Sequence, residues 1–93
     1  LFGMAAGLFV TSGTQGNLLA LLCHCHRGDE YIAGARAHSY LSEGGGGAVL
    51  ASIQPQPLEN NLDGTIDLQK VKNAIKHETC FLKGTSRPSG AIL

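Results

Sequence analysis

A short polar turn between two apolar runs constrains this chain more than any other feature. Residues 5–10 (AAGLFV) are apolar, residues 11–17 (TSGTQGN) are small and polar, and residues 18–22 (LLALL) are apolar again. The pattern predicts a buried strand that enters a turn, from which a helix runs over residues 14–25. Thr11 or Ser12 is the natural N-cap of that helix, because each carries a hydroxyl oxygen that can accept a backbone N–H.

The start of this helix is a candidate phosphate site. Its first N–H groups have no partner inside the helix, and the helix dipole is positive at that end. The N–H groups of Gly13 and Thr14, with the hydroxyls of Ser12 and Thr14, therefore suit a phosphate. The turn lacks both a Walker lysine and a G-x-G-x-x-G pattern, which favours a single phosphomonoester. The alternative is an ordinary helix cap without a ligand.

Composition narrows the class of protein. The 93 residues are 43% hydrophobic and 15% charged, with a formal net charge of zero, so we expect neither nucleic acid nor a membrane surface as a partner. Residues 18–22 are apolar on nearly every side, which predicts a piece of a larger α/β enzyme. Three cysteines, an odd number, favour reduced thiols and the cytoplasm, with an organelle left open.

The rest of the chain alternates strands with helices, which favours a mainly parallel sheet. We expect strands over residues 31–33 and 48–53, the second ended by the prolines of residues 54–57. Between them, residues 36–43 form a loop or short helix, and the glycines of residues 44–47 interrupt regular structure.

Two further segments have clear local signals. Residues 26–29 are the expected exit turn of the first helix, with Gly28 in the left-handed conformation. After a polar turn at residues 60–64, the pattern predicts an amphipathic helix over residues 67–76. Its apolar face carries Leu68, Val71 and Ile75, and its exposed face carries Lys70, Lys72 and Lys76.

Five motifs occur in order along the chain. They are FVTSGTQGNL (9–18), RGDEYI (27–32), AHSY with EGG (37–45), SIQPQP (52–57) and DGT (63–65). Together they resemble the L-threonine aldolase family, lyases that depend on pyridoxal 5′-phosphate and share the fold-type I, aspartate-aminotransferase-like architecture. The resemblance covers roughly residues 6–76 and only part of a typical family member.

The resemblance implies an α/β fold, namely a fragment of the large pyridoxal-phosphate-binding domain with a mainly parallel sheet and flanking helices. Residues 1–76 would be part of that domain, and residues 77–93 a divergent, loop-like tail with at most a short element at residues 79–82. The intact enzyme would cleave L-threonine or L-allo-threonine, a small amino-acid substrate, to glycine and acetaldehyde. It would assemble as a homo-oligomer, a tetramer.

The resemblance also implies roles for individual residues. Ser12, Gly13 and Thr14 would hold the cofactor phosphate. His38 would stack on the cofactor ring near the substrate hydroxyl, where an imidazole either takes the proton as the Cα–Cβ bond breaks or only positions the ring. Glu43 either supports this site or is a surface carboxylate beside a glycine run.

Catalysis by the 93 residues alone is not expected. The lysine that would form the Schiff base, and the Asp that would contact the pyridine nitrogen, are absent from this sequence. Lys70, Lys72, Lys76 and Lys83 lie outside the lysine motif of the family. Two alternatives stay open: another fold-type I enzyme, such as a cysteine-lyase-like or aminotransferase relative, and an inactive remnant that is truncated, spliced or frameshifted.

Two short motifs suggest other functions, and we expect neither. Residues 23–26 (CHCH) offer four metal-ligand types, but consecutive residues on a helix splay around its axis and do not close a tetrahedral site. Residues 27–29 spell an adhesion tripeptide, at a helix exit where glycine and charge are common.

Overall fold

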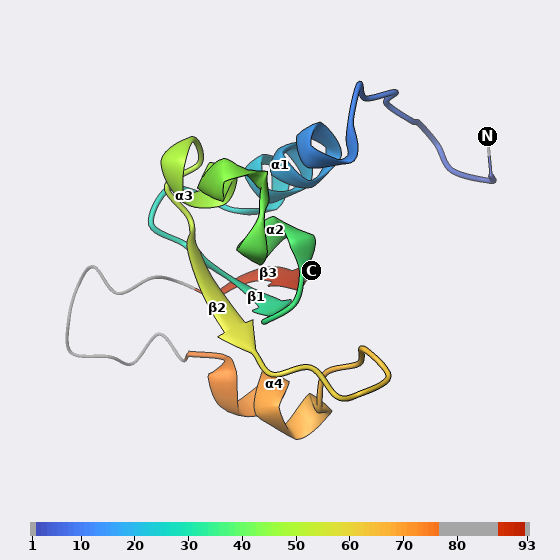
Figure 1. The fold of residues 1–93 in the computed structure, drawn as a ribbon. Coiled ribbons are helices and arrows are strands. Elements are labelled where there is room, and N and C mark those ends of the chain that lie inside the picture. The colour runs from blue at the N-terminus through green and yellow to red at the C-terminus, as the bar shows by residue number, and fades with distance from the viewer. Residues whose placement is uncertain (1, 77–87, 93) are drawn as a thin grey trace.

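The computed structural model describes residues 2–76 and 88–92 of the chain and contains a small parallel sheet with helices around it (Figure 1). The elements in chain order are α1 (Gly13–His24), β1 (Glu30–Gly34), α2 (His38–Leu41), the 3₁₀ turn η1 (Glu43–Gly45), α3 (Gly46–Val49), β2 (Gln54–Leu58), α4 (Leu68–Ala74) and β3 (Pro88–Ile92). The strand order is β2-β1-β3, and β1 is parallel to both neighbours. The expected α/β class with a parallel sheet is therefore correct.

The core lies between α1 and one face of β1. All five residues of β1 are buried, as a central strand requires. Tyr31 and Ala33, two residues apart, share a face, and they belong to one cluster with residues of α1 and of the segment before β2. The cluster consists of Leu21, Cys25, Tyr31, Ala33, Ala51 and Ile53.

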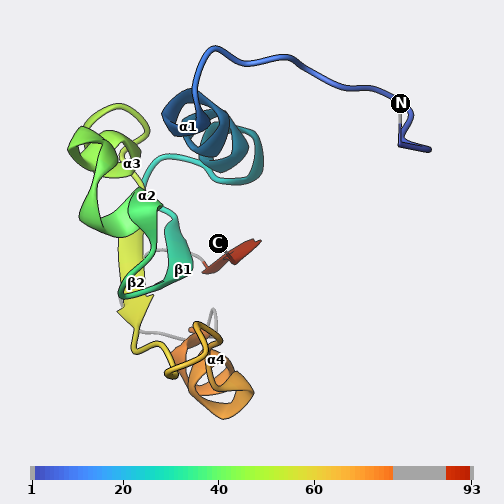
Figure 2. The same ribbon diagram turned by 45° about the vertical axis from the view of Figure 1, so that its right-hand side comes forward.

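Helix α4 lies on the other side of the strands from α1, as both views show (Figure 2). It falls inside the range predicted for the last helix, and Lys70, Lys72 and Lys76 are exposed as expected. Its apolar face is only partly buried, because Val71 is buried whereas Leu68 is 75% exposed. No helix in the described part of the chain has the length and apolar character needed to cross a membrane.

The first strand expected from the sequence does not form. Residues 5–10 run as an irregular, exposed arm that leads away from the sheet (Figures 1 and 2), and Phe9 is 96% exposed. A strand needs a neighbour to satisfy its N–H and C=O groups, and among the described residues the arm pairs with none of the three strands. The helix that follows is confirmed, with Ser12 as its N-cap.

The second strand was predicted too early in the chain. The first two residues of the predicted strand, 48 and 49, instead end α3 (Gly46–Val49), and the strand is Gln54–Leu58, which contains the prolines expected to end it. The N–H of Gln54 donates to the carbonyl of Asp29, 2.9 Å away. Since alternate residues face the same neighbour, Pro55 and Pro57 have their missing N–H groups on the open side of this edge strand.

The glycine run behaves in two ways. Gly44 and Gly45 are left-handed, with φ of 62° and 66°, and interrupt the helix as predicted. Gly46 and Gly47 instead belong to α3. A Cβ on Gly47 would lie 3.2 Å from Cδ1 of Leu21, so this glycine allows close packing against the core of its own chain.

The expectations for β1, α2 and the exit turn of α1 are confirmed, whereas the expectation for the tail is wrong in part. β1 contains residues 31–33, α2 lies within residues 36–43, and Gly28 is left-handed with φ of 86°. The loop-like description of the tail is wrong for Pro88–Ile92, since this segment pairs with the free edge of β1 as β3. The possible element at residues 79–82 lies outside the described residues.

Candidate functional site

The turn that opens α1 is held by reciprocal hydrogen bonds. The Ser12 hydroxyl oxygen accepts from the N–H of Gln15 at 3.1 Å. The Gln15 side-chain oxygen in turn accepts from the N–H of Thr11 at 2.9 Å and from its hydroxyl at 3.0 Å. This is a variant of the capping box, in which the residue at the third helical position bonds back to the chain before the helix.

The residues of this turn fit a phosphate group. The N–H groups of Gly13 and Thr14 have no partner within the helix, and a Cβ on Gly13 would meet nothing within 4 Å. Ser12 only accepts in the cap, so its hydroxyl hydrogen remains to be donated. The first turn of α1 carries no acidic residue that would repel an anion.

His38 and Glu43 form a second feature of the site. His38 is the first residue of α2, shortly after the carboxyl end of β1. Its Nδ1 lies 2.8 Å from Oε1 of Glu43; the histidine side chain is 68% exposed and the glutamate side chain 6% exposed. An ionised carboxylate only accepts hydrogen bonds, so Nδ1 carries the hydrogen and Nε2 is left as the accessible nitrogen.

The same carboxylate oxygen also contacts α1. The Asn17 side-chain amide donates to Oε1 of Glu43 at 2.8 Å. The hydrogen bond with His38, followed by that from Asn17, lowers the pKa of Glu43 from its usual 4.5, although burial acts in the opposite direction. Glu43 is therefore a carboxylate at neutral pH.

The backbone of Glu43 is strained. Its φ is 64°, and Gly44 and Gly45 continue the left-handed turn. For a residue with a side chain, this conformation costs on the order of 1–2 kcal/mol. The turn places the Glu43 side chain between α1 and α2, where it is paired on both sides.

Tyr31 lies close enough to the Glu43 carboxylate for the negative charge to affect its pKa. Its pKa is raised above 10 by burial first, and then by the charges of Glu43 and Tyr40. The Tyr31 hydroxyl donates to the carbonyl of Ser39 at 3.3 Å, so β1 also supports the backbone of α2.

The structure thus brings together two of the predicted site residues and adds a third. Glu43 contacts His38, and Asn17 joins them, although the sequence did not identify it. The available signal was a polar, poorly helix-forming residue directly before the apolar run of α1. Asn17 follows Gly13 by four residues, so both lie on the same side of α1, one turn apart.

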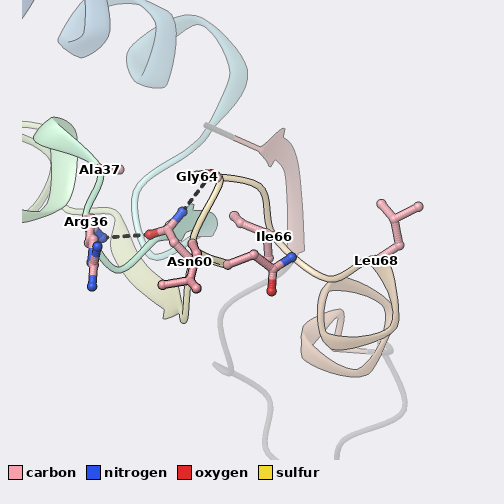
Figure 3. Close-up of a pocket in the computed structure, with 9 residues that line it drawn as sticks. Arg36, Ala37, Asn60, Gly64, Ile66 and Leu68 are labelled. Carbon is pink, nitrogen blue, oxygen red and sulfur yellow. Dashed lines mark hydrogen bonds between the residues drawn. The ribbon is translucent and has the colours of Figure 1, made fainter.

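A cavity of about 600 Å³ lies at the carboxyl ends of β1 and β2 (Figure 3). Asn60 organises it: its Oδ1 accepts from the N–H of Arg36 at 3.0 Å, and its amide donates to the carbonyl of Gly64 at 3.1 Å. Ligands of α/β proteins usually bind at this end of parallel strands. Ala37, the neighbour of His38, also lines the cavity. For residues 60–64, which form another part of the cavity wall, the sequence predicted only a polar turn.

The cysteines and histidines of residues 23–26 do not converge. Cys23 is exposed and Cys25 is buried in the core. Within the described residues, no group of three or more His, Cys, Asp or Glu side chains is placed to hold a metal ion.

Comparison with known proteins identifies the class. The beta-eliminating lyase family matches residues 1–86, and the chain belongs to this family of lyases, which implies dependence on pyridoxal phosphate. Within it, the chain is similar to L-threonine aldolases, so the resemblance drawn from the five motifs is confirmed. The match extends beyond residue 76, where the resemblance drawn from the motifs ends.

Three relatives illustrate this similarity. The low specificity L-threonine aldolase of Escherichia coli (strain K12) is 58% identical over 76 residues, which is 82% of this chain and 23% of that protein. Uncharacterized protein R102.4 of Caenorhabditis elegans is 49% identical over 82 residues, 88% of this chain and 20% of that protein. Low-specificity L-threonine aldolase 1 of Arabidopsis thaliana is 40% identical over 77 residues, which is 82% of this chain and 22% of that protein. The chain therefore spans less than a quarter of the length of these relatives.

Proposed function

We propose that this chain supplies the phosphate-binding segment of a pyridoxal-phosphate-dependent threonine aldolase, which cleaves L-threonine or L-allo-threonine to glycine and acetaldehyde. In this proposal residues 1–76 are part of the large domain of a fold-type I enzyme that assembles as a homotetramer. The observation that carries it is the open start of α1 one helical turn before Asn17, whose amide binds the carboxylate that pairs with the His38 imidazole. Similarity to threonine aldolases from bacteria and plants supports it.

The phosphate of the cofactor is held at the start of α1. The N–H groups of Gly13 and Thr14 and the hydroxyls of Ser12 and Thr14 donate to its oxygens, and the helix dipole favours its negative charge. Hydrogen bonds to a charged partner are the strong ones, at roughly 1.5–3 kcal/mol each. An anchored phosphate fixes the cofactor ring, which holds the reacting bond in one orientation.

His38 acts on the substrate hydroxyl or on the ring. When bound, pyridoxal phosphate supplies the electron sink for cleavage at the amino acid's Cα. Nε2 of His38, the nitrogen turned away from Glu43, accepts the proton of the β-hydroxyl, and the Glu43 carboxylate stabilises the resulting imidazolium. In the alternative role, the His38 ring only stacks on the cofactor and keeps it in plane.

The 93 residues alone bind the cofactor without turning over threonine. Cleavage also needs a lysine that bonds the cofactor, and none of the chain's lysines lies in the lysine motif of threonine aldolases. The competing proposal is a remnant that binds no cofactor at all.

Two ligands that differ only in the phosphate test the site. Pyridoxine 5′-phosphate and pyridoxine both lack the aldehyde, so neither reacts with surface lysines. We expect calorimetry to give at least about tenfold tighter binding of the phosphorylated ligand, which corresponds to roughly 1.4 kcal/mol. Equal affinities would contradict the phosphate site and favour the remnant. Acetaldehyde release from L-threonine by the chain alone would contradict its inactivity.

A further inference from the structure

One oxygen atom connects the first two helices. Oε1 of Glu43 accepts from the amide of Asn17 in α1 and pairs with Nδ1 of His38 in α2, both at 2.8 Å. We propose that Asn17 is a positioning residue for His38 and acts through this carboxylate. The inference deepens the proposed function and rests on it, because it assigns a residue that orients the proposed imidazole.

The geometry explains why the amide has this effect. The Glu43 side chain is only 6% exposed, so water has little access to replace a lost partner. Its backbone is fixed by the left-handed turn, but the side-chain torsions of a glutamate remain free to rotate. The Asn17 amide removes that freedom by holding the oxygen that also faces Nδ1 of His38.

The consequence for His38 is a choice of tautomer. A neutral imidazole carries its hydrogen on Nδ1 or Nε2, and the hydrogen bond made by one nitrogen decides which. With Oε1 held at Nδ1, the hydrogen stays on Nδ1 and Nε2 keeps its lone pair. A carboxylate that turns away from Nδ1 releases this preference.

Asn17 also sets the position of His38 relative to the helix start. Gly13 and Asn17 lie one turn apart on the same side of α1. The same helix thus carries both the proposed phosphate donors and the amide that fixes Glu43. Their spacing is therefore set by helix geometry rather than by a flexible loop.

Nitrogen-15 NMR of the imidazole measures the tautomer without any cofactor. Spectra of the full 93-residue chain at about pH 8.5 keep an ordinary histidine neutral and leave Tyr31, whose pKa is raised by burial and by the charge of Glu43, protonated. His38→Gln identifies the signals of this ring among the four histidines. The test variants are Asn17→Leu, which keeps the branched shape of the side chain but cannot donate a hydrogen bond, and Asn17→Ser, which is too short to reach Glu43.

The matched control is Asn73→Leu. Asn73 lies in α4, where its side chain accepts a hydrogen bond from Gln69 at 3.0 Å, and it is far from His38 in sequence. We expect the native chain and this control to hold the Nδ1–H tautomer. Both Asn17 variants should lower the ratio of Nδ1–H to Nε2–H roughly fivefold, the effect of losing one hydrogen bond.

Unchanged tautomer ratios in folded Asn17 variants would overturn the inference and leave Asn17 a purely structural role. If Asn17→Leu unfolds, Asn17→Ser decides, with circular dichroism as the check of folding. The pKa of Glu43, followed through its carboxyl carbon, gives a second readout and should rise in the variants. A chain that keeps the Nδ1–H tautomer but binds both pyridoxine ligands equally would refute the proposed phosphate site, and with it the catalytic meaning of the inference, while the effect of Asn17 on the His38 tautomer would still hold.

Discussion

Lys76 pairs with Glu30 across 46 residues of sequence, with Nζ 2.7 Å from Oε1. The Glu30 side chain is 2% exposed at the start of the central strand, whereas the Lys76 side chain is 48% exposed just after α4. The pair therefore ties the segment after the last described helix to the middle of the sheet. A buried carboxylate that loses a cationic partner is costly, because its charge remains in a poorly solvated place.

Lys76→Met should lower the free energy of unfolding by about 1–3 kcal/mol, between the values for exposed and buried ion pairs. Lys70→Met is the matched control, since Lys70 lies 3.5 Å from Glu59 and both side chains are exposed. That change should cost less than about 1 kcal/mol. Urea denaturation followed by circular dichroism measures both, and equal losses would contradict the structural importance of the Glu30 pair.

Gly13→Asp should separate helix stability from phosphate binding. A carboxylate in the first turn stabilises the helix by about 0.3–1 kcal/mol, because its negative charge interacts with the positive end of the helix dipole. The space around Gly13 is open, so the side chain fits. The same charge repels a phosphate, so pyridoxine 5′-phosphate should bind at least about tenfold more weakly, or roughly 1.4 kcal/mol. Gly13→Ala adds a side chain without charge and should keep the affinity. Similar affinities for the two variants would place the phosphate elsewhere.

Gly34→Ala should disturb the cavity at the ends of β1 and β2. The added Cβ would lie 2.7 Å from Oδ1 and 2.9 Å from Cγ of Asn60, too close for either atom. Displacing Asn60 breaks its bonds to Arg36 and Gly64, and overpacking of this kind costs about 1–3 kcal/mol. Gly7→Ala, in open space, is the control. If Asn60→Ala does not reduce the penalty of Gly34→Ala, the clash is not its cause.

The stability of the chain should fall in acid partly through Glu43. Because its pKa is lowered in the folded chain, the unfolded chain takes up the proton first as the pH falls below 4.5. The stabilisation is therefore complete above that pH and disappears as the pH passes down through the folded pKa. In Glu43→Gln this contribution is absent at every pH. Urea midpoints from pH 7 to 3 should converge for the two proteins in acid, and a constant difference would contradict the prediction.

Asp63 also has a lowered pKa, but it does not affect the comparison. Hydrogen bonds from the side chain and backbone of Thr65 lower its pKa. This group is the same in both proteins, so its effect cancels in their difference.

Local signals made α1 and β1 predictable. The apolar run of α1 and the hydroxyl of Ser12 act within a few residues, and the structure has the helix and cap where the sequence places them. Residues 5–10 have an equally apolar pattern but form no strand, because a strand also depends on a neighbour that its own residues do not specify.

The side-chain network was less accessible to sequence reasoning. His38 and Glu43 come from the motifs, but their contact depends on a left-handed backbone at Glu43, which few non-glycine residues adopt. Asn17 lies 26 residues before Glu43, and only the packing of α1 beside α2 brings them together. The roles proposed for Ser12, Gly13, Thr14 and His38 remain predictions.

The prolines of β2 also determine how the sheet can grow. With their nitrogens on the side away from β1, Pro55 and Pro57 leave that border with carbonyl groups but few donors. An incoming strand finds no complete ladder there, so another molecule has little to pair with during refolding or at high concentration. The two prolines thus oppose the addition of a strand at the outer edge of β2. They do not weaken the pairing between β2 and β1, because every N–H of β2 that faces β1 is kept.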